Sequence, residues 1–296
     1  MTSALFAEIA EAISHASGEP FRLVGQQEAA GGCINRSLSL YGADGRRYFV
    51  KLNQATQADM FAAEAAGLDA LRAARAIRVP VPLTQGLAAG QAFLVMEWLA
   101  LTPGDAQFGA QLGEQLAQLH RTSRPAFGWH RDNCIGSTPQ ANPATDDWVT
   151  FYREFRLRPQ LVLAAKNGAT PRLLETGERL LAGLADFFSG YTPQPSLLHG
   201  DLWSGNAAAC AGQPVLFDPA VYFGDRETDL AMTELFGGFS SSFYAAYRAD
   251  WPLDSGYATR KALYQLYHLL NHFNLFGESY ARQSQAVIDR LLAALR

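Results

Sequence analysis

The sequence predicts an α+β protein with two lobes, a small lobe that contains a β-sheet and a larger lobe that is mainly helical. Strand-like, turn-punctuated segments fill much of the first hundred residues, and the pattern becomes mostly helical from about Leu101 onward. The chain has 296 residues and is 48% hydrophobic, which suffices for two lobes around a sizeable core. We therefore place the lobes at residues 1–98 and 99–296, with a connector near Glu97 to Gly104.

The small lobe begins with "MTSALFAEIAEAISHASG", in which acidic residues interrupt the apolar positions. This pattern predicts an amphipathic helix, and the absence of a basic leading segment argues against a signal peptide. Turn residues at Gly31-Gly32 and Asp44-Gly45 then divide a strand-like segment. A helix follows in "QADMFAAEAAGLDALRAARAI", and we expect Pro80 and Pro82 to end it. "AFLVMEWL" predicts a buried strand that leads into the connector.

The larger lobe contains four helical stretches, which we expect at 108–122, 148–166, 173–188 and from Asp229 to the C-terminus. One strand-like segment interrupts them, "LLHGDLWSGNAAACAGQPVLFDPA", from Leu197 to Ala220. We expect an antiparallel hairpin here, with strands at 206–210 and 214–218 and a turn at 211–213.

Composition excludes several classes of protein. The formal net charge is −4, and no long basic run is present, so nucleic acid is a poor candidate partner. Cys33, Cys134 and Cys210 form no CxxC pair and no zinc-site spacing, which favours a reducing cytoplasm. No apolar run approaches the roughly 20 residues that a membrane span needs.

The expected hairpin brings together oxygen-bearing side chains. A tight turn places Asn206 opposite or next to Asp218, because facing residues in a hairpin are close neighbours. Asp201 lies just upstream and is free to face the same point. Carboxylate and amide oxygens suit Mg²⁺, so this segment is a candidate metal–phosphate site with a base beside it. Each residue alone is more often a turn residue, but the whole set in this order is not explained that way.

A second candidate feature pairs Lys51 with Glu64. Lys51 ends the apolar strand "RRYFVK", where a lysine is usually only solvated. On the following helix, Met60, Glu64, Leu68 and Leu71 fall on one stripe. A carboxylate on an apolar stripe is costly unless it is paired, and Lys51 is its natural partner.

Several motifs together resemble the fructosamine kinase family, also called ketosamine-3-kinases. The spacing from Asp201 to Asn206 matches the D-x-x-x-x-N of a kinase catalytic loop, and Asp218 occupies the position of the DFG aspartate. "HGD" and "DPA" replace HRD and DFG, as in small-molecule kinases. "HGDLWSGN" and "FGGFSSSFYAAY" are the most specific segments. "GGCIN", "FVK", "VMEWL", "DWVTFY" and "YQLYHLLNHFNLFG" extend the resemblance from about Gly31 to Gly277.

The resemblance implies a bilobal protein-kinase-like fold and the use of ATP with Mg²⁺. It implies that Asp201 accepts the proton of the acceptor hydroxyl, that Asn206 and Asp218 hold the metal, and that Lys51 and Glu64 orient the phosphates. It also implies a phosphate-covering turn and an adenine-binding connector. These comprise Gly31, Gly32, Cys33, Ile34 and Asn35 for the turn, and the backbone N–H and C=O groups near Met96, Glu97, Trp98 and Leu99 for the connector.

Two residues are expected to support the loop that contains Asp201. His199 braces the loop and is not the base. Asp229 opens the following helix, and it either caps that helix or accepts N–H bonds from the loop. Cys33 is either a small apolar filler or a redox-sensitive thiol near Lys51.

The implied substrate is a ketoamine, a sugar joined through C1 to an amine and phosphorylated on its 3-hydroxyl. The phosphorylated adduct then breaks down and frees the amine, which implies a role in deglycation. Trp203 either packs in the core or offers a flat face to the sugar. His272, Asn271 and His268 are candidate acceptor-pocket residues, with helix packing as the alternative, favoured slightly for His268.

Other functions remain open at this stage. A kinase for an aminoglycoside, for choline or for another small alcohol would share the fold, and composition does not separate them. A non-catalytic nucleotide-binding scaffold is a further alternative, although such proteins usually lack one of the residues above. A metallohydrolase is disfavoured, because the six histidines include no HExxH spacing. The sequence does not identify the sugar or the amine.

Overall fold

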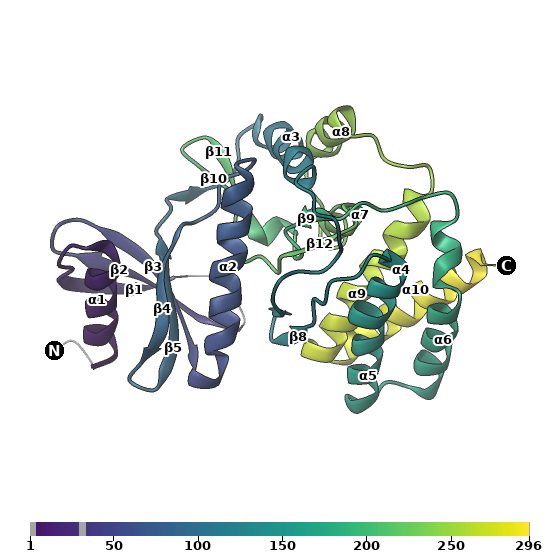
Figure 1. The fold of residues 1–296 in the computed structure, drawn as a ribbon, viewed down its shortest axis with the longest axis horizontal. Helices are drawn as coiled ribbons and strands as arrows, with labels where there is room; N and C mark the ends of the chain where they lie inside the picture. The colour runs from purple at the N-terminus through teal and green to yellow at the C-terminus, as the bar shows by residue number, and fades with distance from the viewer. Residues whose placement is uncertain (1–3, 30–33, 296) are drawn as a thin grey trace.

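The computed structural model describes residues 4–29 and 34–295, which form two lobes (Figure 1). The N-terminal lobe is a five-stranded antiparallel sheet of order β1-β2-β3-β5-β4, with helix α1 on one face and α2 on the other. The elements of this lobe are α1 (Ala4–Ser17), β1 (Leu23–Glu28), β2 (Arg36–Gly42), β3 (Arg47–Gln54), α2 (Ala58–Ala74), β4 (Pro82–Ala88) and β5 (Gln91–Glu97).

Alternation along each strand decides which helix its side chains meet. On β5, Val95 packs in the cluster that includes α1, whereas Met96 packs in the cluster that includes α2. Side chains on a strand alternate between the two faces. On β3, Val50 therefore packs with α1, and the next residue, Lys51, points to the α2 side. Period-two alternation thus brings one lysine to the face where the two lobes meet.

Helix α2 ends earlier than the sequence predicted. Its last residue is Ala74, and Arg75 follows in the left-handed conformation with φ of 54°. Pro80 and Pro82 therefore do not end the helix, and that expectation was wrong. Pro82 instead begins β4, an unpredicted strand at the edge of the sheet, where a missing N–H donor is tolerated.

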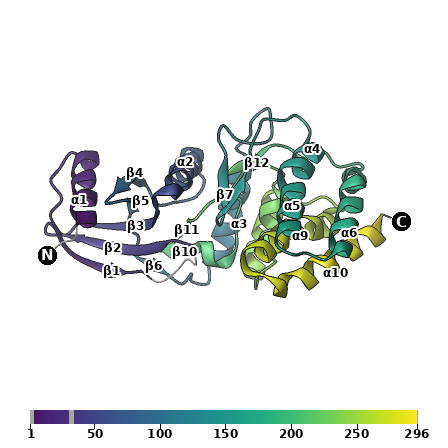
Figure 2. The ribbon, with the colours of Figure 1, turned by 90° about the horizontal axis from the view of Figure 1, so that it is seen from below.

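The C-terminal lobe is mainly helical, as predicted, and contains several short strands (Figure 2). A π-helical stretch at 153–157 joins α4 to α5. The elements are β6 (Leu101–Thr102), α3 (Phe108–His120), β7 (Asn133–Ile135), β8 (Thr138–Gln140), α4 (Trp148–Tyr152), α5 (Arg158–Lys166), α6 (Pro171–Ala182), β9 (Ser196–Leu198), β10 (Ala207–Cys210), β11 (Gln213–Leu216), β12 (Tyr222–Gly224), α7 (Glu227–Thr233), α8 (Ser241–Asp250), α9 (Tyr257–Phe276) and α10 (Ala281–Ala294).

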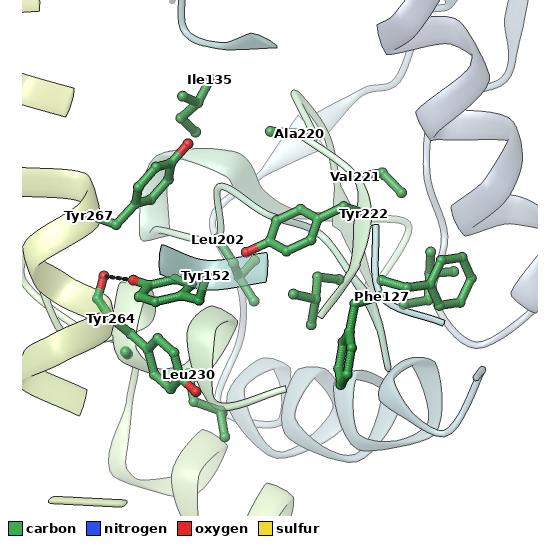
Figure 3. Close-up of a cluster of buried hydrophobic side chains, with 14 of the residues drawn as sticks. Phe127, Ile135, Tyr152, Leu202, Ala220, Val221, Tyr222, Leu230, Tyr264 and Tyr267 are labelled. Carbon is green, nitrogen blue, oxygen red and sulfur yellow. Dashed lines mark hydrogen bonds between the residues drawn. The ribbon is translucent and has the colours of Figure 1, made fainter. Parts of the chain in front are cut away.

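An aromatic core anchors the loop that follows β9. Figure 3 shows Leu202 close to Tyr152 and Tyr222, in a cluster that also contains Tyr264 and Tyr267. Leu202 is fully buried, and it follows Asp201 directly in the chain. Burial of this one leucine therefore fixes the backbone on which Asp201 stands.

The core of the C-terminal lobe extends into the N-terminal lobe. The same cluster of buried residues includes Phe61 and Leu68 from α2 and Leu112 and Leu116 from α3. The bilobal α+β prediction is confirmed, while the boundary at residue 98 stays a prediction. None of the helices within residues 4–29 and 34–295 combines the length and the hydropathy of a membrane span.

Candidate active site

The predicted hairpin is present as β10 and β11, with a shorter turn than expected. The turn consists of Ala211 and Gly212, both with positive φ (50° and 76°), the conformation that suits a two-residue hairpin. Gln213 belongs to β11 and pairs with Cys210. The predicted three-residue turn at 211–213 was therefore wrong, and each strand is one residue shorter than predicted, because β10 begins one residue later and β11 begins one residue earlier and ends two residues earlier.

The open end of this hairpin brings Asn206 beside Asp218. The N–H of Phe217 donates to the carbonyl of Asn206 over 3.1 Å, which continues the hairpin pairing to the residue before Asp218. Asn206 also faces Asp201, because its amide nitrogen donates to the Asp201 carbonyl at 2.9 Å and lies 3.4 Å from a carboxylate oxygen. The three predicted residues therefore converge.

Hydrogen bonds from the backbone fix the segment of residues 199–206, which we call the 199–206 loop. Asp229 accepts the N–H of His199 at 2.7 Å and that of Gly200 at 2.9 Å. Asp229 lies inside α7 rather than at its cap, so it accepts bonds from the loop and does not cap the helix. The His199 ring lies 3.0 Å from the Phe217 carbonyl, which ties the loop to β11. At Gly200, φ is 83° and a Cβ would collide with the Ala220 carbonyl, so only glycine fits.

A second layer of buried groups supports Asp229, and the sequence did not reveal it. His120, at the end of α3, places Nε2 3.1 Å from Asp229 and Nδ1 2.8 Å from the hydroxyl of Tyr247 on α8. Arg226 donates to the same hydroxyl over 3.0 Å. Burial raises the pKa of Asp229, but the hydrogen bond from His120 and that from the N–H of Gly200 outweigh it and lower the pKa below its ordinary value. Asp229 is therefore held ionised.

A sequence signal for His120 did exist. His120 falls on the buried face of α3 with Leu112, Leu116 and Leu119, and it is itself fully buried. A polar residue on an apolar stripe needs a partner, which is the same argument that paired Glu64 with Lys51.

Lys51 contacts two carboxylates from opposite sides of the cleft between the lobes. Its Nζ lies 2.5 Å from Glu64 on α2 and 2.7 Å from Asp218. Burial lowers the pKa of Lys51, but the charges of Glu64 and Asp218 outweigh it and raise the pKa above its ordinary value. The ion pair expected from the sequence is present, and Asp218 joins it from the other lobe.

Asp218 itself adopts a strained backbone conformation. Its φ is 57°, in the left-handed region that residues with a Cβ rarely adopt. Strain of this kind concentrates at functional sites. Its side chain is 42% exposed, and its Oδ2 atom makes no hydrogen bond within the described residues. One carboxylate oxygen is thus held by Lys51 while the other faces the cleft.

The carboxyl group of Asp201 has a raised pKa of about 7. Burial is the main cause, and the negative charges of Asp218 and Asp229 add to it. Three carboxylates share this region, so a bound cation would relieve their mutual repulsion.

These groups line a cavity of about 870 Å³ that both lobes form. Residues from β2, β3, α2 and β5 line one side, and residues from β7, the 199–206 loop and α9 line the other. The predicted site residues in its lining are Ile34, Asn35, Lys51, Glu64, Met96, Glu97, Leu99, Asp201, Trp203, Asn206, Asp218 and His272.

Not every predicted connector residue reaches this cavity. Trp98 is absent from its lining, and the guanidinium of Arg47 lies over the indole ring, 5.1 Å from the ring centroid. The carboxylate of Glu97 pairs with Arg78 at 2.7 Å, which leaves its backbone to face the cavity. Alternation after Glu97 turns the ring of Trp98 outward, so the predicted adenine-binding role of this residue stays a prediction about its backbone.

The phosphate-covering turn is only partly visible. Gly31, Gly32 and Cys33 lie outside the described residues. Asn35 accepts a hydrogen bond from the side-chain amide of Asn53 at 2.7 Å, which fixes the end of the turn against β3.

Two predicted substrate residues, Trp203 and His272, also line the cavity. Trp203 is 38% exposed, which is inconsistent with a core role, and a Cβ on Gly205 would collide with its indole ring. The ring therefore lies against the backbone of the 199–206 loop. His272 is half-buried and lines the cavity. His268, one turn earlier on α9, is buried outside the lining, as expected of a packing residue.

The donor set fits a hard divalent cation. Within the described ranges, no group of three or more His, Cys, Asp or Glu side chains has the arrangement of a metal site. Asn206 uses its amide nitrogen for Asp201, so its oxygen is free to bind a cation beside the open oxygen of Asp218. Oxygen ligands with room for water and phosphate are what Mg²⁺ takes.

Comparison with known proteins adds an independent finding. Residues 5–294 match the family described as fructosamine kinase. A probable ketoamine kinase of Synechocystis sp. is 48% identical over 289 residues, 96% of each chain, and a chloroplastic protein-ribulosamine 3-kinase of Arabidopsis thaliana is 42% identical over 270 residues, 90% of this chain and 82% of that one. A crystal structure from Haemophilus somnus, provisionally named a fructosamine-3-kinase, superposes with a TM-score of 0.90 at 29% identity over 98% of both chains.

Proposed function

Because the chain belongs to the fructosamine kinase family, we propose that its cleft binds ATP and transfers the γ-phosphoryl group to the 3-hydroxyl of a ketoamine. The observation that supports this most strongly is the convergence of Asp201, Asn206 and Asp218 with Lys51 in one cavity, although Lys51 lies far from the other three in the sequence. Each of these residue types has a distinct task in phosphoryl transfer.

Lys51 supplies the positive charge on the nucleotide side. Glu64 fixes its ammonium group, as in the kinase Lys–Glu pair that orients the α- and β-phosphates. The backbone of the connector, from Met96 to Leu99, would bind the adenine edge, and Ile34 and Asn35 would close over the phosphates. In this proposal the lobe of residues 1–98 binds the nucleotide and residues 99–296 bind the acceptor.

Asn206 and Asp218 would hold Mg²⁺ through their oxygens. When bound, Mg²⁺ neutralises negative charge between the transferred and leaving phosphate oxygens. The chain itself keeps Asp218 in place through Lys51 and through the pairing of Phe217 with Asn206. The left-handed backbone of Asp218 turns its free oxygen to the cleft.

Asp201 would orient the acceptor hydroxyl and accept its proton. Phosphoryl transfer through a loose transition state needs only a weakly basic carboxylate. With a pKa of about 7, Asp201 is more basic than this reaction needs. His199 and Asp229 keep the backbone of the loop fixed, so the carboxylate is placed before the substrate arrives. Preorganisation of this kind lowers the reorganisation needed for reaction.

The acceptor would lie between Trp203 and His272. The exposed indole of Trp203 offers a flat apolar face to a sugar ring, and His272 faces the same cavity. Phosphorylation at C3 places a phosphate leaving group next to the carbon that bears the carbonyl group. The adduct can then eliminate phosphate to leave an imine at C1, and water hydrolyses this imine and releases the amine, which makes deglycation the proposed role.

The proposal is tested by the rate of ADP formation from MgATP with four acceptors, namely ribulosyl-lysine, fructosyl-lysine, kanamycin and choline. Turnover on a ketoamine is the expected result, and the ratio of the two ketoamines identifies the preferred sugar. Turnover restricted to kanamycin or choline would contradict the proposed substrate while keeping the kinase assignment. ATP binding without turnover on any acceptor would favour a scaffold.

A further inference from the structure

The acceptor end of the cavity has an aromatic corner formed by Phe236, His272, Phe276 and Tyr280. All four residues line the cavity, and they come from the segment after α7, from α9 and from the turn that follows α9. The His272 ring lies at the centre, with centroids 4.6 Å from Phe236, 5.4 Å from Phe276 and 5.1 Å from Tyr280. Phe276 is 52% exposed, so its ring is open to contact with a ligand in the cavity.

The hydrogen bond of His272 determines what its ring can offer. Nδ1 lies 2.8 Å from the carbonyl of His268, and a carbonyl can only accept, so Nδ1 holds the proton. Burial lowers the pKa of His272, which keeps the ring neutral near pH 7. Nε2 therefore has a free lone pair, and within residues 4–29 and 34–295 it has no hydrogen-bond partner. The corner thus presents a hydrogen-bond acceptor surrounded by aromatic faces.

The charges around the cavity also favour a cation. Its described lining contains three carboxylates that face the cavity, those of Glu64, Asp201 and Asp218. Lys51 is the one lysine or arginine in that described lining, and both Glu64 and Asp218 already contact it. Aromatic faces attract cations, and the unprotonated nitrogen of a neutral imidazole accepts a hydrogen bond from an ammonium group. No described basic group in the lining would repel an ammonium at this end.

We propose that the aromatic corner binds the protonated secondary amine of the ketoamine, so that the enzyme selects an amine-bearing sugar over a neutral one. This inference rests on the proposed function. In a ketoamine the nitrogen is on C1, three bonds from C3, so one bound substrate can present its 3-hydroxyl to Asp201 and its nitrogen to the corner. Nε2 accepts the ammonium N–H, and the rings of Phe276 and Tyr280 face the charge.

The test uses two acceptors that differ in one atom. One is a ketoamine with an N-propyl group, and the other is its ether isostere, in which oxygen replaces the NH and no positive charge forms. The quantity measured is kcat/KM for each acceptor at saturating MgATP. We expect the wild type to prefer the amine by about tenfold or more, an interaction difference of about 1.4 kcal/mol or more.

Variants of the corner show whether the preference arises there. Phe276→Leu and Tyr280→Leu keep apolar bulk and remove the aromatic face, and each should lower the amine-to-ether ratio several-fold. Tyr41→Leu, on β2 outside the cavity lining, is the matched aromatic control and should leave the ratio unchanged. The shift in Tm on adding MgATP verifies that every variant is folded.

The outcomes separate this inference from the proposed function. Equal kcat/KM values for the two wild-type substrates would overturn the inference while upholding ketoamine phosphorylation. A strong preference that the corner variants leave unchanged would also overturn it, because the amine would then bind elsewhere. Phosphorylation of neither acceptor would overturn the proposed function and the inference with it.

Discussion

At the scale of single residues, one ammonium group holds two carboxylates that come from opposite lobes. Lys51 contacts Glu64 and Asp218, and it is only 4% exposed. In a buried cluster, removing one partner costs more than the pair contributes, because it leaves an uncompensated charge. The position of the Lys51 side chain therefore depends on Glu64.

We predict that Glu64→Ala raises the KM for ATP or lowers kcat by about tenfold or more, because Lys51 then swings toward Asp218 and away from the phosphates. Steady-state kinetics with varied ATP measure this. Asp69→Ala, which removes an exposed carboxylate and its Arg72 pair from the same helix, is the control. Kinetics of wild-type quality in Glu64→Ala would refute the functional pairing.

His268 gives a second residue-scale prediction, this one about stability. Burial, with a smaller effect from His272, lowers its pKa to about 3, and the charge of Asp229 opposes this only partly. The unfolded chain takes up this proton below about pH 6.5, whereas the folded protein does not. Because the folded state binds fewer protons, the free energy of unfolding falls as pH decreases, by about 1.4 kcal/mol per unit between pH 6.5 and 3.

Replacement of His268 by leucine should remove this dependence. Between pH 7.5 and 5.0 the free energy of unfolding should fall by about 2 kcal/mol more in the wild type than in His268→Leu. About 1.5 pH units of that interval lie below pH 6.5, where the unfolded chain takes up the proton. Urea denaturation at the two pH values measures the difference, with the exposed His15→Leu as control. Equal losses in wild type and His268→Leu would show that the buried ring is not the source.

Individual site residues were predictable where the chemistry is local in sequence. Asp201, Asn206 and Asp218 lie within one short segment, so their convergence followed from hairpin geometry. Glu64 was found because its apolar stripe left it in need of a partner. For Trp98 the sequence predicted a backbone role in the connector, and such a role says nothing about where the side chain points. Tyr247 gave no signal, since a tyrosine on an amphipathic helix is an ordinary core residue.

At the scale of elements, helices α3, α7 and α8 meet behind the 199–206 loop. Arginine has only donors, so the Tyr247 hydroxyl accepts from Arg226 and gives its own proton to Nδ1 of His120. Nε2 of His120 then carries a proton and donates to Asp229. This chain of bonds fixes the acceptor that holds the loop backbone, so α8 influences the site without contacting it.

We predict that Tyr247→Phe lowers kcat about tenfold, or about 1.4 kcal/mol, while the KM for ATP changes less than about twofold. The loss of the hydroxyl leaves Nδ1 of His120 without its donor. We expect this to weaken the hydrogen bonds through which Asp229 holds the loop backbone. Tyr264→Phe is the matched control, because its hydroxyl is also buried but binds Asp225 instead. Equal kcat in Tyr247→Phe and wild type would contradict the positioning role.

Elements were predicted best where periodicity was long. The helices of the larger lobe and the hairpin before Asp218 were expected, because their patterns extend over several turns or contain a clear turn signal. Strand β4 was missed, since Pro82 stands at its start and edge strands tolerate proline. The early end of α2 depends on one left-handed residue, Arg75, which sequence alone does not mark.

At the scale of the whole molecule, the two lobes share more than a connector. Lys51 crosses the cleft to Asp218, and β6 of the connector pairs with β10 of the hairpin. The core under α2 is continuous with that of the helical lobe. Such contacts depend on residues far apart in the chain, so the sequence predicted two lobes but not how they join.

The central claim is that this shared cleft is a kinase site in which Asp201 accepts the proton of a ketoamine hydroxyl. Phosphoryl transfer from MgATP to a ketoamine, followed by ³¹P NMR, tests it in wild type, in Asp201→Asn and in the exposed control Asp59→Asn. We predict a sugar 3-phosphate from wild type and control, and a rate lower by roughly 10²–10⁴-fold in Asp201→Asn with MgATP binding retained. A rate in Asp201→Asn close to that of wild type would contradict the account.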